Sequence, residues 1–377
     1  MEIIRSQEIE LSKMLMPHKV TLLLGARRVG KSILIEKFLE NYKKPYLLLN
    51  GEDEDTHDLL AKRTTANYKR ILNGYELLVI DEAQAIPDIG KKLKLIVDTI
   101  KGVKVLVTGS SAFDLLNVSG EPLTGRSNTL NLYPIWQGEL KEGALQTKQN
   151  LEDRLVYGAY PELWHYDKAE DKKRYLLELV NAYLLKDILI LDGIRSPSVI
   201  FNLLKMIAYQ IGKEVSYNEL GTSLGISKNT VEKYLNLLTQ VFVLIKVPAY
   251  SNNLRKEISK SQRWYFVDNG IRNAVIQDFT PLALRNGSDV GMLWENYLFM
   301  ERVKRNTYKK ETKTYCFWRT YDQQEIDLIE VKNKTIAAFE FKYSAAKLPK
   351  IPVAFQKAYP KAAFKVINEK NYLDFIL

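Results

Sequence analysis

Hydrophobic positions in the first third of the chain fall into short runs of four to six residues, separated by longer amphipathic segments. The segment 32–39, for example, places Ile35, Phe38 and Leu39 on one side of a helix. Four runs are apolar enough to form strands, at residues 20–24, 45–50, 77–80 and 103–107, and those at 20–24 and 77–80 predict buried strands. Buried strands that alternate with amphipathic helices predict an α/β domain with a parallel sheet.

The middle of the chain has helical rather than strand periodicity. Residues 150–210 carry apolar residues at helical spacing and predict a helical lid. Residues 216–224 and 227–238 each begin at a serine that can cap a helix, and a tight turn at Gly225 separates them. This spacing predicts a helix-turn-helix. Two strands would complete a winged helix, at residues 241–247 and 263–267.

The pattern changes again near Gly291, where a long helix begins. Four strands and one helix are expected after it, with strands at 315–318, 325–331, 335–342 and 364–367 and a helix at 354–359. We therefore expect four domains. These are an α/β domain at 1–145, the helical lid at 146–205, the winged helix-turn-helix at 206–268 and a second α/β domain at 269–377.

Residues 25–32, Gly-Ala-Arg-Arg-Val-Gly-Lys-Ser, fit the phosphate-binding loop G-x-x-x-x-G-K-[ST] and lie between a predicted strand and a predicted helix. The backbone N–H groups of such a loop surround phosphate oxygens at the positive end of the helix. Lys31 is expected to reach the β- and γ-phosphates of ATP, and Ser32 to give its hydroxyl to Mg²⁺. The expected nucleotide contacts are Gly25, Ala26, Arg27, Arg28, Val29, Gly30, Lys31, Ser32 and Ile33.

The strand at 77–80 continues directly into Asp81 and Glu82, and the carboxyl ends of strands are where parallel sheets bind ligands. Asp81 would hold Mg²⁺, and Glu82 would polarise the water that attacks the γ-phosphate. The strand at 103–107 ends in a polar segment, in which Ser110 or Thr108 could sense that phosphate. A simple Ser/Gly turn is the alternative there.

Arg126 follows a glycine after a polar segment. An arginine on a loop can stabilise transition-state charge, usually in a neighbouring subunit. A Gly-Arg pair is also common without such a role, and action in cis or in trans stays open.

The sequence of 377 residues has 55 Lys and Arg against 45 Asp and Glu, a formal net charge of +10. This excess favours a polyanionic partner, most simply nucleic acid. One cysteine and three histidines argue against a disulfide and a structural zinc site. No apolar run approaches a membrane span and the N-terminus lacks the layout of a signal peptide, so we expect a cytoplasmic protein.

The second helix of the predicted helix-turn-helix is the candidate for DNA contact. Its outward residues would be Lys228, Asn229, Lys233 and Tyr234. Winged helices also serve as lids and as protein-docking units, so both interpretations stay open.

Four motifs, G-A-R-R-V-G-K-S, L-L-V-I-D-E-A-Q, V-T-G-S-S and L-T-G-R, are followed by L-Y-P-I-W at 132–136. Together they resemble the predicted AAA+ superfamily ATPases of bacteria and archaea, P-loop NTPases with a C-terminal domain of unknown function. The segment Gly-Ala-Tyr-Pro-Glu at 158–162 is similar to a G-G-x-P-E segment of that family. By this resemblance Tyr160 and Pro161 would contact the nucleotide.

The order of elements after residue 290 resembles the PD-(D/E)xK nuclease fold, an α/β restriction-endonuclease-like domain. Asp327 matches the first acid, and Glu340-Phe341-Lys342 matches E-x-K. The resemblance implies that Asp327, Glu340 and Glu295 hold Mg²⁺, that Lys342 helps to deprotonate water, and that Gln356 lies near DNA. The basic run 302–313 could grip phosphates or be an ordinary solvated face.

The first hypothesis is an ATP-hydrolysing, DNA-binding protein that couples nucleotide state to the binding or remodelling of DNA. ATP and Mg²⁺ would be its cofactors, and a homo-oligomer would be its working form if Arg126 acts in trans. Nuclease relatives suggest branched or junction DNA, which is an argument from analogy. The alternatives are a nucleotide-controlled switch that binds a protein partner in signalling or defence, and a Mg²⁺-dependent DNA nuclease that ATP regulates.

Overall fold

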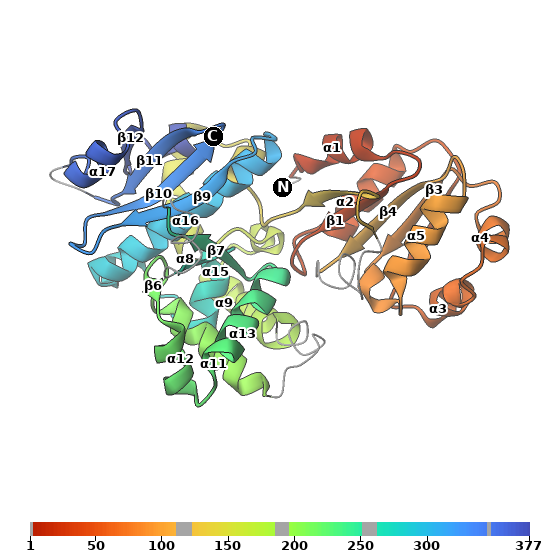
Figure 1. Cartoon of the computed structure of the whole chain (residues 1–377), viewed down its shortest axis with the longest axis horizontal. Coiled ribbons are helices and arrows are strands. Elements are labelled where there is room, and N and C mark those ends of the chain that lie inside the picture. Colours follow the sequence, from red (N-terminus) through yellow and green to blue (C-terminus); the bar gives the residue numbers. More distant parts are fainter. Residues whose placement is uncertain (1–2, 111–122, 185–195, 251–261, 345–347) are drawn as a thin grey trace. The chain divides into compact units, whose positions relative to one another are not determined.

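The computed structural model describes residues 3–110, 123–184, 196–250, 262–344 and 348–377 (Figure 1). It divides into two compact units. The N-terminal unit comprises Glu2–Tyr133 and Gln240–Phe242, and the C-terminal unit comprises Pro134–Thr239 and Val243–Leu377. The first boundary therefore follows Tyr133, whereas the sequence pattern placed it after residue 145.

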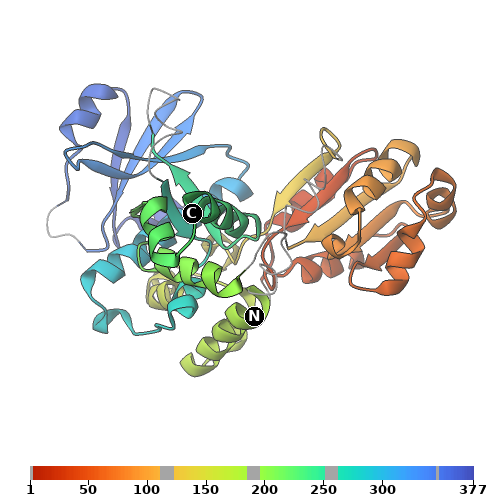
Figure 2. The same cartoon turned by 60° about the horizontal axis from the view of Figure 1, so that its bottom comes forward.

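The N-terminal unit is built on one five-stranded parallel sheet with the strand order β2-β3-β4-β1-β5. The strands are β1 (Val20–Leu24), β2 (Tyr46–Asn50), β3 (Leu77–Asp81), β4 (Lys104–Gly109) and β5 (Ser127–Asn131). Every residue of β1 is buried, because helices cover both faces of the sheet (Figure 2). The strand β2 lies at an edge and alternates between exposed and half-buried residues.

The helices of this unit fill the segments between strands. They are α1 (Gln7–Met14), α2 (Lys31–Glu40), α3 (Glu54–Ala61), α4 (Thr65–Ile71), α5 (Ile89–Thr99) and the 3-10 turn η1 (Ala83–Ala85). In α5 the apolar stripe of Ile89, Leu93 and Ile96 is fully buried and joins the strands in one core. The predicted α/β domain with a parallel sheet is thus confirmed.

The C-terminal unit begins with helices. Up to residue 208 they are η2 (Gln137–Glu139), α7 (Ala144–Gln149), α8 (Leu151–Val156), η3 (Pro161–His165), α9 (Ala169–Glu178), the π-helical segment η4 (Leu179–Leu184) and α11 (Pro197–Ala208). Further along the chain come α15 (Asn269–Ile276), η5 (Leu282–Leu284) and the long helix α16 (Gly287–Tyr308). In the part of the chain that the structure describes, no helix is long and apolar enough to cross a membrane.

Between α11 and α15 lie two helices, α12 (Tyr217–Leu224) and α13 (Lys228–Gln240), joined at Gly225 in the left-handed region (φ 66°). One strand before these helices and two strands after them in the chain form a small antiparallel sheet, ordered β6-β8-β7. Its strands are β6 (Glu214–Val215), β7 (Leu244–Pro248) and β8 (Gln262–Phe266). Tyr234 was expected to face outward from α13, but it is only 4% exposed, because its ring packs into the core.

The last part of the unit is a four-stranded sheet with the order β12-β11-β10-β9. Its strands are β9 (Thr314–Arg319), β10 (Glu325–Lys332), β11 (Thr335–Phe341) and β12 (Ala363–Ile367), with helices α17 (Val353–Ala358) and α18 (Tyr372–Ile376). The strands β9, β10 and β11 are antiparallel, and β12 pairs parallel to β11. A bridge between Ala249 and Phe317 connects the small sheet to β9.

The segment that follows the first unit is anchored on α16. The backbone N–H of Gln137 donates to Glu301 Oε2 at 2.7 Å, and Lys304 Nζ donates to the carbonyl oxygen of Ile135 at 3.1 Å. The indole of Trp136 donates to the carbonyl oxygen of Ile376 at 2.8 Å. These contacts place residues 134–140 in the C-terminal unit and explain the earlier boundary.

The basic run 302–313 is largely used inside the unit. Arg302 and Lys313 both contact the buried carboxylate of Glu330, at 2.7 and 2.8 Å, and Lys304 is 3% exposed and paired with Glu301. Side chains engaged in buried ion pairs are not available to phosphates, and loss of one partner would leave the other charge buried and uncompensated. The structure thus favours a structural role for these three side chains.

Candidate functional sites

The phosphate-binding motif forms a loop between the carboxyl end of β1 and the first residue of α2. Gly30 adopts a left-handed backbone (φ 94°) as the residue before the helix. A Cβ at Gly25 would collide with the carbonyl oxygen of Leu132, so the close approach of these two segments requires glycine. Glycine is therefore needed at both fixed positions of the loop for this backbone course.

The ammonium of Lys31 is 4% exposed and lies inside this loop. It donates to the carbonyl oxygens of Gly25 at 3.0 Å and Ala26 at 3.1 Å, and it lies 3.7 Å from Glu82 Oε1. A phosphate group in the loop would compete with these acceptors for the same positive charge. Lys31 is thus in position for a nucleotide.

Oxygen ligands meet at the ends of β1, β3 and β4. Ser32 Oγ donates to Asp81 Oδ2 at 2.7 Å, and Thr108 Oγ1 donates to Asp81 Oδ1. The backbone N–H of Glu82 in turn donates to Thr108 Oγ1 at 2.9 Å. A hydroxyl beside a carboxylate is the donor set that Mg²⁺ prefers, so Ser32 and Asp81 fit this ion.

Glu82 has a left-handed backbone (φ 48°), which is uncommon for a residue with a side chain. Its carboxylate accepts a hydrogen bond from Gln84 Nε2 at 2.5 Å, and the same amide lies 3.2 Å from Ser110 Oγ. Gln84 therefore connects the two strand ends, a role the sequence reasoning missed. Its position two residues after Glu82, on the turn η1, is the sequence feature that could have indicated this role.

Comparison with known families decides what this unit is. Residues 17–141 match a family model described as an AAA domain. The N-terminal unit is an AAA-like P-loop ATPase domain. Two further models, described as domains of unknown function (DUF8612 and DUF4143), match residues 148–282 and 290–374.

Similar whole chains are also known. An uncharacterized protein of Mycobacterium tuberculosis is 27% identical over 327 residues, which are 86% of this chain and 70% of that protein. An uncharacterized protein of Haemophilus influenzae is 23% identical over 342 residues, 83% of this chain and 80% of that protein. Among solved structures, a Walker-type ATPase of Pyrococcus abyssi shares 17% identity with a TM-score of 0.48, covering 72% of this chain and 94% of its own.

Arg126 lies at the end of the ATPase sheet that is opposite to the phosphate-binding loop. Its carbonyl oxygen accepts from the N–H of Val20, the first residue of β1, whereas the loop follows Leu24. At about 3.3 Å per residue, that strand separates the two by about 15 Å. Its guanidinium contacts Asp98 Oδ1 at 2.7 Å, so the structure does not bring Arg126 to the phosphates of its own chain.

A pocket of about 440 Å³ opens beside the oxygen ligands of the ATPase domain. Its lining includes Ser32, Asp81 and, from the edge strand, Leu48. The acidic loop 51–55 borders it, and Asp53 there caps α3 by accepting from the N–H of Asp55 at 3.0 Å. This capping accounts for one of the loop's acidic residues without a catalytic role.

The residues that resemble a nuclease site also come together, in the C-terminal unit. Asp327 on β10 and Glu340 on β11 lie next to the paired residues Leu328 and Phe339 of these two strands. The N–H of Phe341 donates to Asp327 Oδ2 at 2.8 Å. Lys342 Nζ contacts Glu340 Oε1 at 2.9 Å. Glu295 reaches the cluster from α16 and accepts from the hydroxyl of Tyr265 at 2.6 Å.

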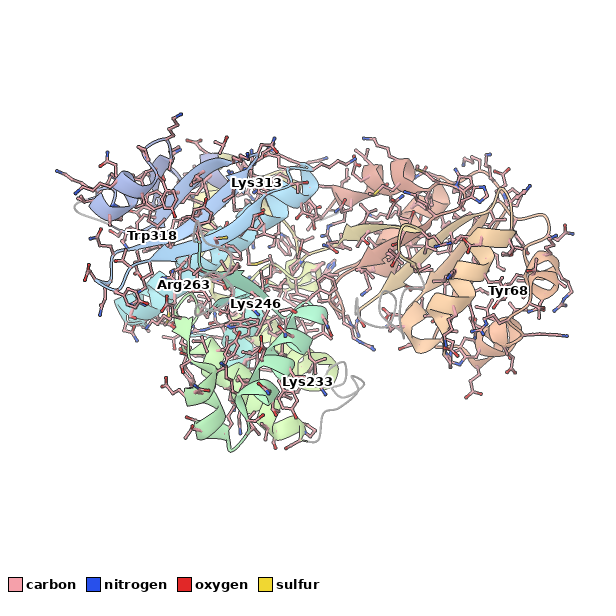
Figure 3. The ribbon with its side chains drawn as sticks, in the orientation of Figure 1. Tyr68, Lys233, Lys246, Arg263, Lys313 and Trp318 are labelled. Carbon is pink, nitrogen blue, oxygen red and sulfur yellow. The ribbon has the colours of Figure 1, made fainter. Side chains whose placement is uncertain are left out.

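One member of this cluster was not predicted. Arg263, on β8, is 3% exposed, and Figure 3 shows it where the small sheet meets the C-terminal strands. Its Nη1 lies 3.7 Å from both Glu295 Oε1 and Asp327 Oδ1, and its Nη2 lies 2.9 Å from Glu325 Oε2. Among the residues that the structure describes, no group of three or more His, Cys, Asp or Glu side chains is arranged to hold a metal ion. A Mg²⁺ site at Glu295, Asp327 and Glu340 stays a prediction, and a guanidinium lies close to two of these carboxyl groups.

Burial governs the protonation of this cluster. Loss of solvent, and then the charge of Asp327, raise the pKa of Glu295 to about 8 and that of Glu340 to about 7. Both carboxyl groups therefore take up a proton at a higher pH than an exposed glutamate does. An adjoining cleft of about 890 Å³ is lined by Glu295, Asp327, Lys342 and residues of α7 and α16.

The remaining predicted residues lie elsewhere in the C-terminal unit. Lys228, Asn229 and Lys233 are exposed on α13, and Gln356 is exposed on α17. Figure 3 shows Lys233 on the helix-turn-helix, away from Arg263.

The segment 158–162 has a structural role within its own unit. The N–H of Ala159 donates to Asp268 Oδ2 at 2.7 Å, and a Cβ at Gly158 would collide with the same carboxylate. Tyr160 is 5% exposed. A nucleotide contact by Tyr160 and Pro161 stays a prediction.

Proposed function

We propose that this chain binds and hydrolyses ATP with Mg²⁺ and that nucleotide state controls the binding of DNA by its C-terminal unit. The observation that carries the proposal is the chain of hydrogen bonds from Ser32 through Asp81 and Thr108 to Glu82. It links the Mg²⁺-type ligands to the backbone of Glu82, whose carboxylate lies 3.7 Å from Lys31 Nζ in the same P-loop ATPase domain. Hydrolysis requires both within one site.

The proposed roles follow from position. Lys31 leaves the carbonyl oxygens of Gly25 and Ala26 and neutralises phosphate charge, while Ser32 and Asp81 hold Mg²⁺. The ion would offset the charge that develops on the phosphate oxygens. Glu82 takes a proton from the attacking water. Its carboxylate is aimed by the amide of Gln84, whose second contact is Ser110.

Arg126 is assigned to a neighbouring copy of the chain. Its position, about 15 Å along β1 from the phosphate-binding loop, leaves action in trans as the form of the arginine-finger hypothesis that fits. This assignment makes a homo-oligomer the working state. The partner copy would then complete the site.

Two observations support DNA as the partner. The first is the order α11, β6, α12, α13, β7, β8, which is that of a winged helix, with Lys228, Asn229 and Lys233 exposed on the second helix of the turn. The second is charge, since residues 134–377 carry 36 Lys and Arg against 28 Asp and Glu, most of the net +10. A polycationic surface binds phosphates with strong dependence on salt.

The test is ATP hydrolysis by the full chain, alone and with single-stranded, duplex and four-way-junction DNA. The variant Glu82→Gln reports contaminating ATPase. Stimulation by one DNA form supports the proposal and identifies the preferred substrate, including the branched form suggested by analogy. Hydrolysis that no DNA changes, together with no mobility shift, would overturn the DNA part and favour a switch that binds a protein partner.

A further inference from the structure

The carboxylate cluster of the C-terminal unit already contains a cation that belongs to the chain. Arg263 is one of the most buried charged residues, and its guanidinium contacts Glu325 at 2.9 Å. Its other terminal nitrogen is equidistant, at 3.7 Å, from carboxylate oxygens of Glu295 and Asp327. A planar guanidinium with several donors matches such a group of carboxylates well.

One oxygen of each of three carboxyl groups in the cluster is engaged by another donor of the chain. Asp327 Oδ2 accepts from the N–H of Phe341, Glu295 Oε1 accepts from Tyr265, and Glu340 Oε1 contacts Lys342. A Mg²⁺ ion requires oxygen ligands at about 2.0–2.1 Å in octahedral geometry. The Arg263 guanidinium lies 3.7 Å from both Glu295 and Asp327, so its charge would repel a divalent cation at these carboxyl groups.

The other side of Arg263 is fixed by the sheet. Its guanidinium carbon lies 4.5 Å from the ring centroid of Phe317 on β9, within the range of a cation–π contact. Phe317 also forms the bridge to Ala249, and its carbonyl oxygen accepts from the N–H of Tyr250 at 2.6 Å. The same few residues therefore hold the guanidinium and join the small sheet to β9.

We propose that Arg263 takes the place of a divalent metal in the nuclease-like site, closing it to metal-dependent DNA cleavage and fastening the small sheet to the C-terminal sheet. The cluster then stabilises the packing of the small sheet against the C-terminal sheet and has no catalytic role. The inference depends neither on ATP hydrolysis nor on DNA binding by the helix-turn-helix. It argues against the Mg²⁺-dependent nuclease alternative.

The test uses Mn²⁺, which gives a magnetic resonance signal when free, with the nucleotide-free full chain. The Asp81→Asn background removes the ligand expected to bind metal in the ATPase domain. We expect this parent and the same chain with Asp327→Asn to bind equal amounts of Mn²⁺. Adding Arg263→Gln to the parent is expected to create one Mn²⁺ site per chain, and adding Asp327→Asn to that variant should abolish it.

Asp327-dependent Mn²⁺ binding with Arg263 intact would overturn the proposal, as would Mg²⁺- or Mn²⁺-dependent plasmid nicking that Asp327→Asn removes. If Arg263→Gln does not fold, the comparison between the parent and Asp327→Asn decides alone. Equal binding in that pair supports the closed site. Arg263→Lys keeps the charge but loses the planar group. We expect this variant to fold with a lower melting temperature and to have no Mn²⁺ site. A Mn²⁺ site in it would contradict the proposal that the positive charge excludes the metal.

Discussion

The guanidinium of Arg5 donates to the carbonyl oxygen of Val29, in the phosphate-binding loop, at 2.7 Å. Its second terminal nitrogen donates to the carbonyl oxygen of Tyr133 at 2.6 Å, and the side chain is buried. Arg5, which lies outside the motif, thus connects the phosphate-binding loop to Tyr133 through hydrogen bonds. The loop's shape depends on this contact.

We predict that Arg5→Ala lowers both the stability of the ATPase domain and its affinity for ATP. Each buried carbonyl that loses its donor costs about 1–3 kcal/mol. Urea unfolding and nucleotide titration would measure the two effects. Arg5→Lys, which can reach one carbonyl but not both, is the matched control. Its stability and ATP affinity should lie between those of the unmodified chain and those of Arg5→Ala. Unchanged affinity in Arg5→Ala would show that the loop is fixed by other contacts.

We expect mutations to separate ATP binding from ATP hydrolysis. Lys31→Ala removes the charge that meets the phosphates, so ATP binding should be lost. Glu82→Gln keeps the shape of the side chain but removes the base, so binding should persist while turnover falls by about 10²–10⁴-fold. Binding by fluorescence and single-turnover hydrolysis distinguish these results. Nearly normal turnover in Glu82→Gln would exclude it as the base.

A role of Arg126 in trans makes a prediction about mixtures. Arg126→Ala and Glu82→Gln should each be nearly inactive, yet an equimolar mixture should recover activity, because some interfaces combine an intact Glu82 with an intact Arg126. Hydrolysis is measured against protein concentration. Mixtures no more active than the average of the two variants would argue against an arginine supplied by a neighbour.

Gly158 is expected to be far more sensitive to alanine than Gly74. Both have positive φ angles, 77° and 83°, which cost an L-residue about 1–2 kcal/mol. Nothing lies within 4 Å of a Cβ at Gly74, whereas one at Gly158 meets the buried carboxylate of Asp268. We expect Gly158→Ala to cost about 2–5 kcal/mol in thermal unfolding of the C-terminal unit, from strain and overpacking together. Equal losses at both sites would show that backbone conformation alone matters.

Contacts between DNA phosphates and α13 can be tested through salt dependence. Lys228→Ala with Lys233→Ala should weaken DNA binding and lower the slope of log affinity against log salt by about 2. Lys168→Ala, at an exposed lysine outside the helix-turn-helix, is the control and should leave the slope unchanged. If the paired variant keeps the parental slope, the DNA contacts lie on another surface.

The sequence was most informative where function depends on neighbouring residues. The loop at Gly25–Ser32 and the pair Asp81–Glu82 each sit at the end of one buried run, so a local pattern located them. The Ser32–Asp81 contact followed from the geometry of a parallel sheet. Gln84 was missed because its importance comes from the strand β4 beside it, not from its own segment.

Long-range contacts account for the errors. Arg263 lies 32 residues before Glu295 and 64 before Asp327, and only the packing of β8 with α16 and with the C-terminal sheet brings them together. Helical spacing placed Tyr234 on the outward face of α13, whereas the structure buries it. The boundary at Tyr133 depends on Glu301 and Lys304, which no pattern near residue 134 could indicate.

The bridge between Ala249 and Phe317 has a thermodynamic consequence. Two sheets that share backbone hydrogen bonds and a buried guanidinium cannot melt one after the other without exposing unpaired groups. The helix-turn-helix and the C-terminal sheet therefore form one cooperative block. A chain whose sequence divides into four domains is expected to show two heat-absorption peaks in calorimetry.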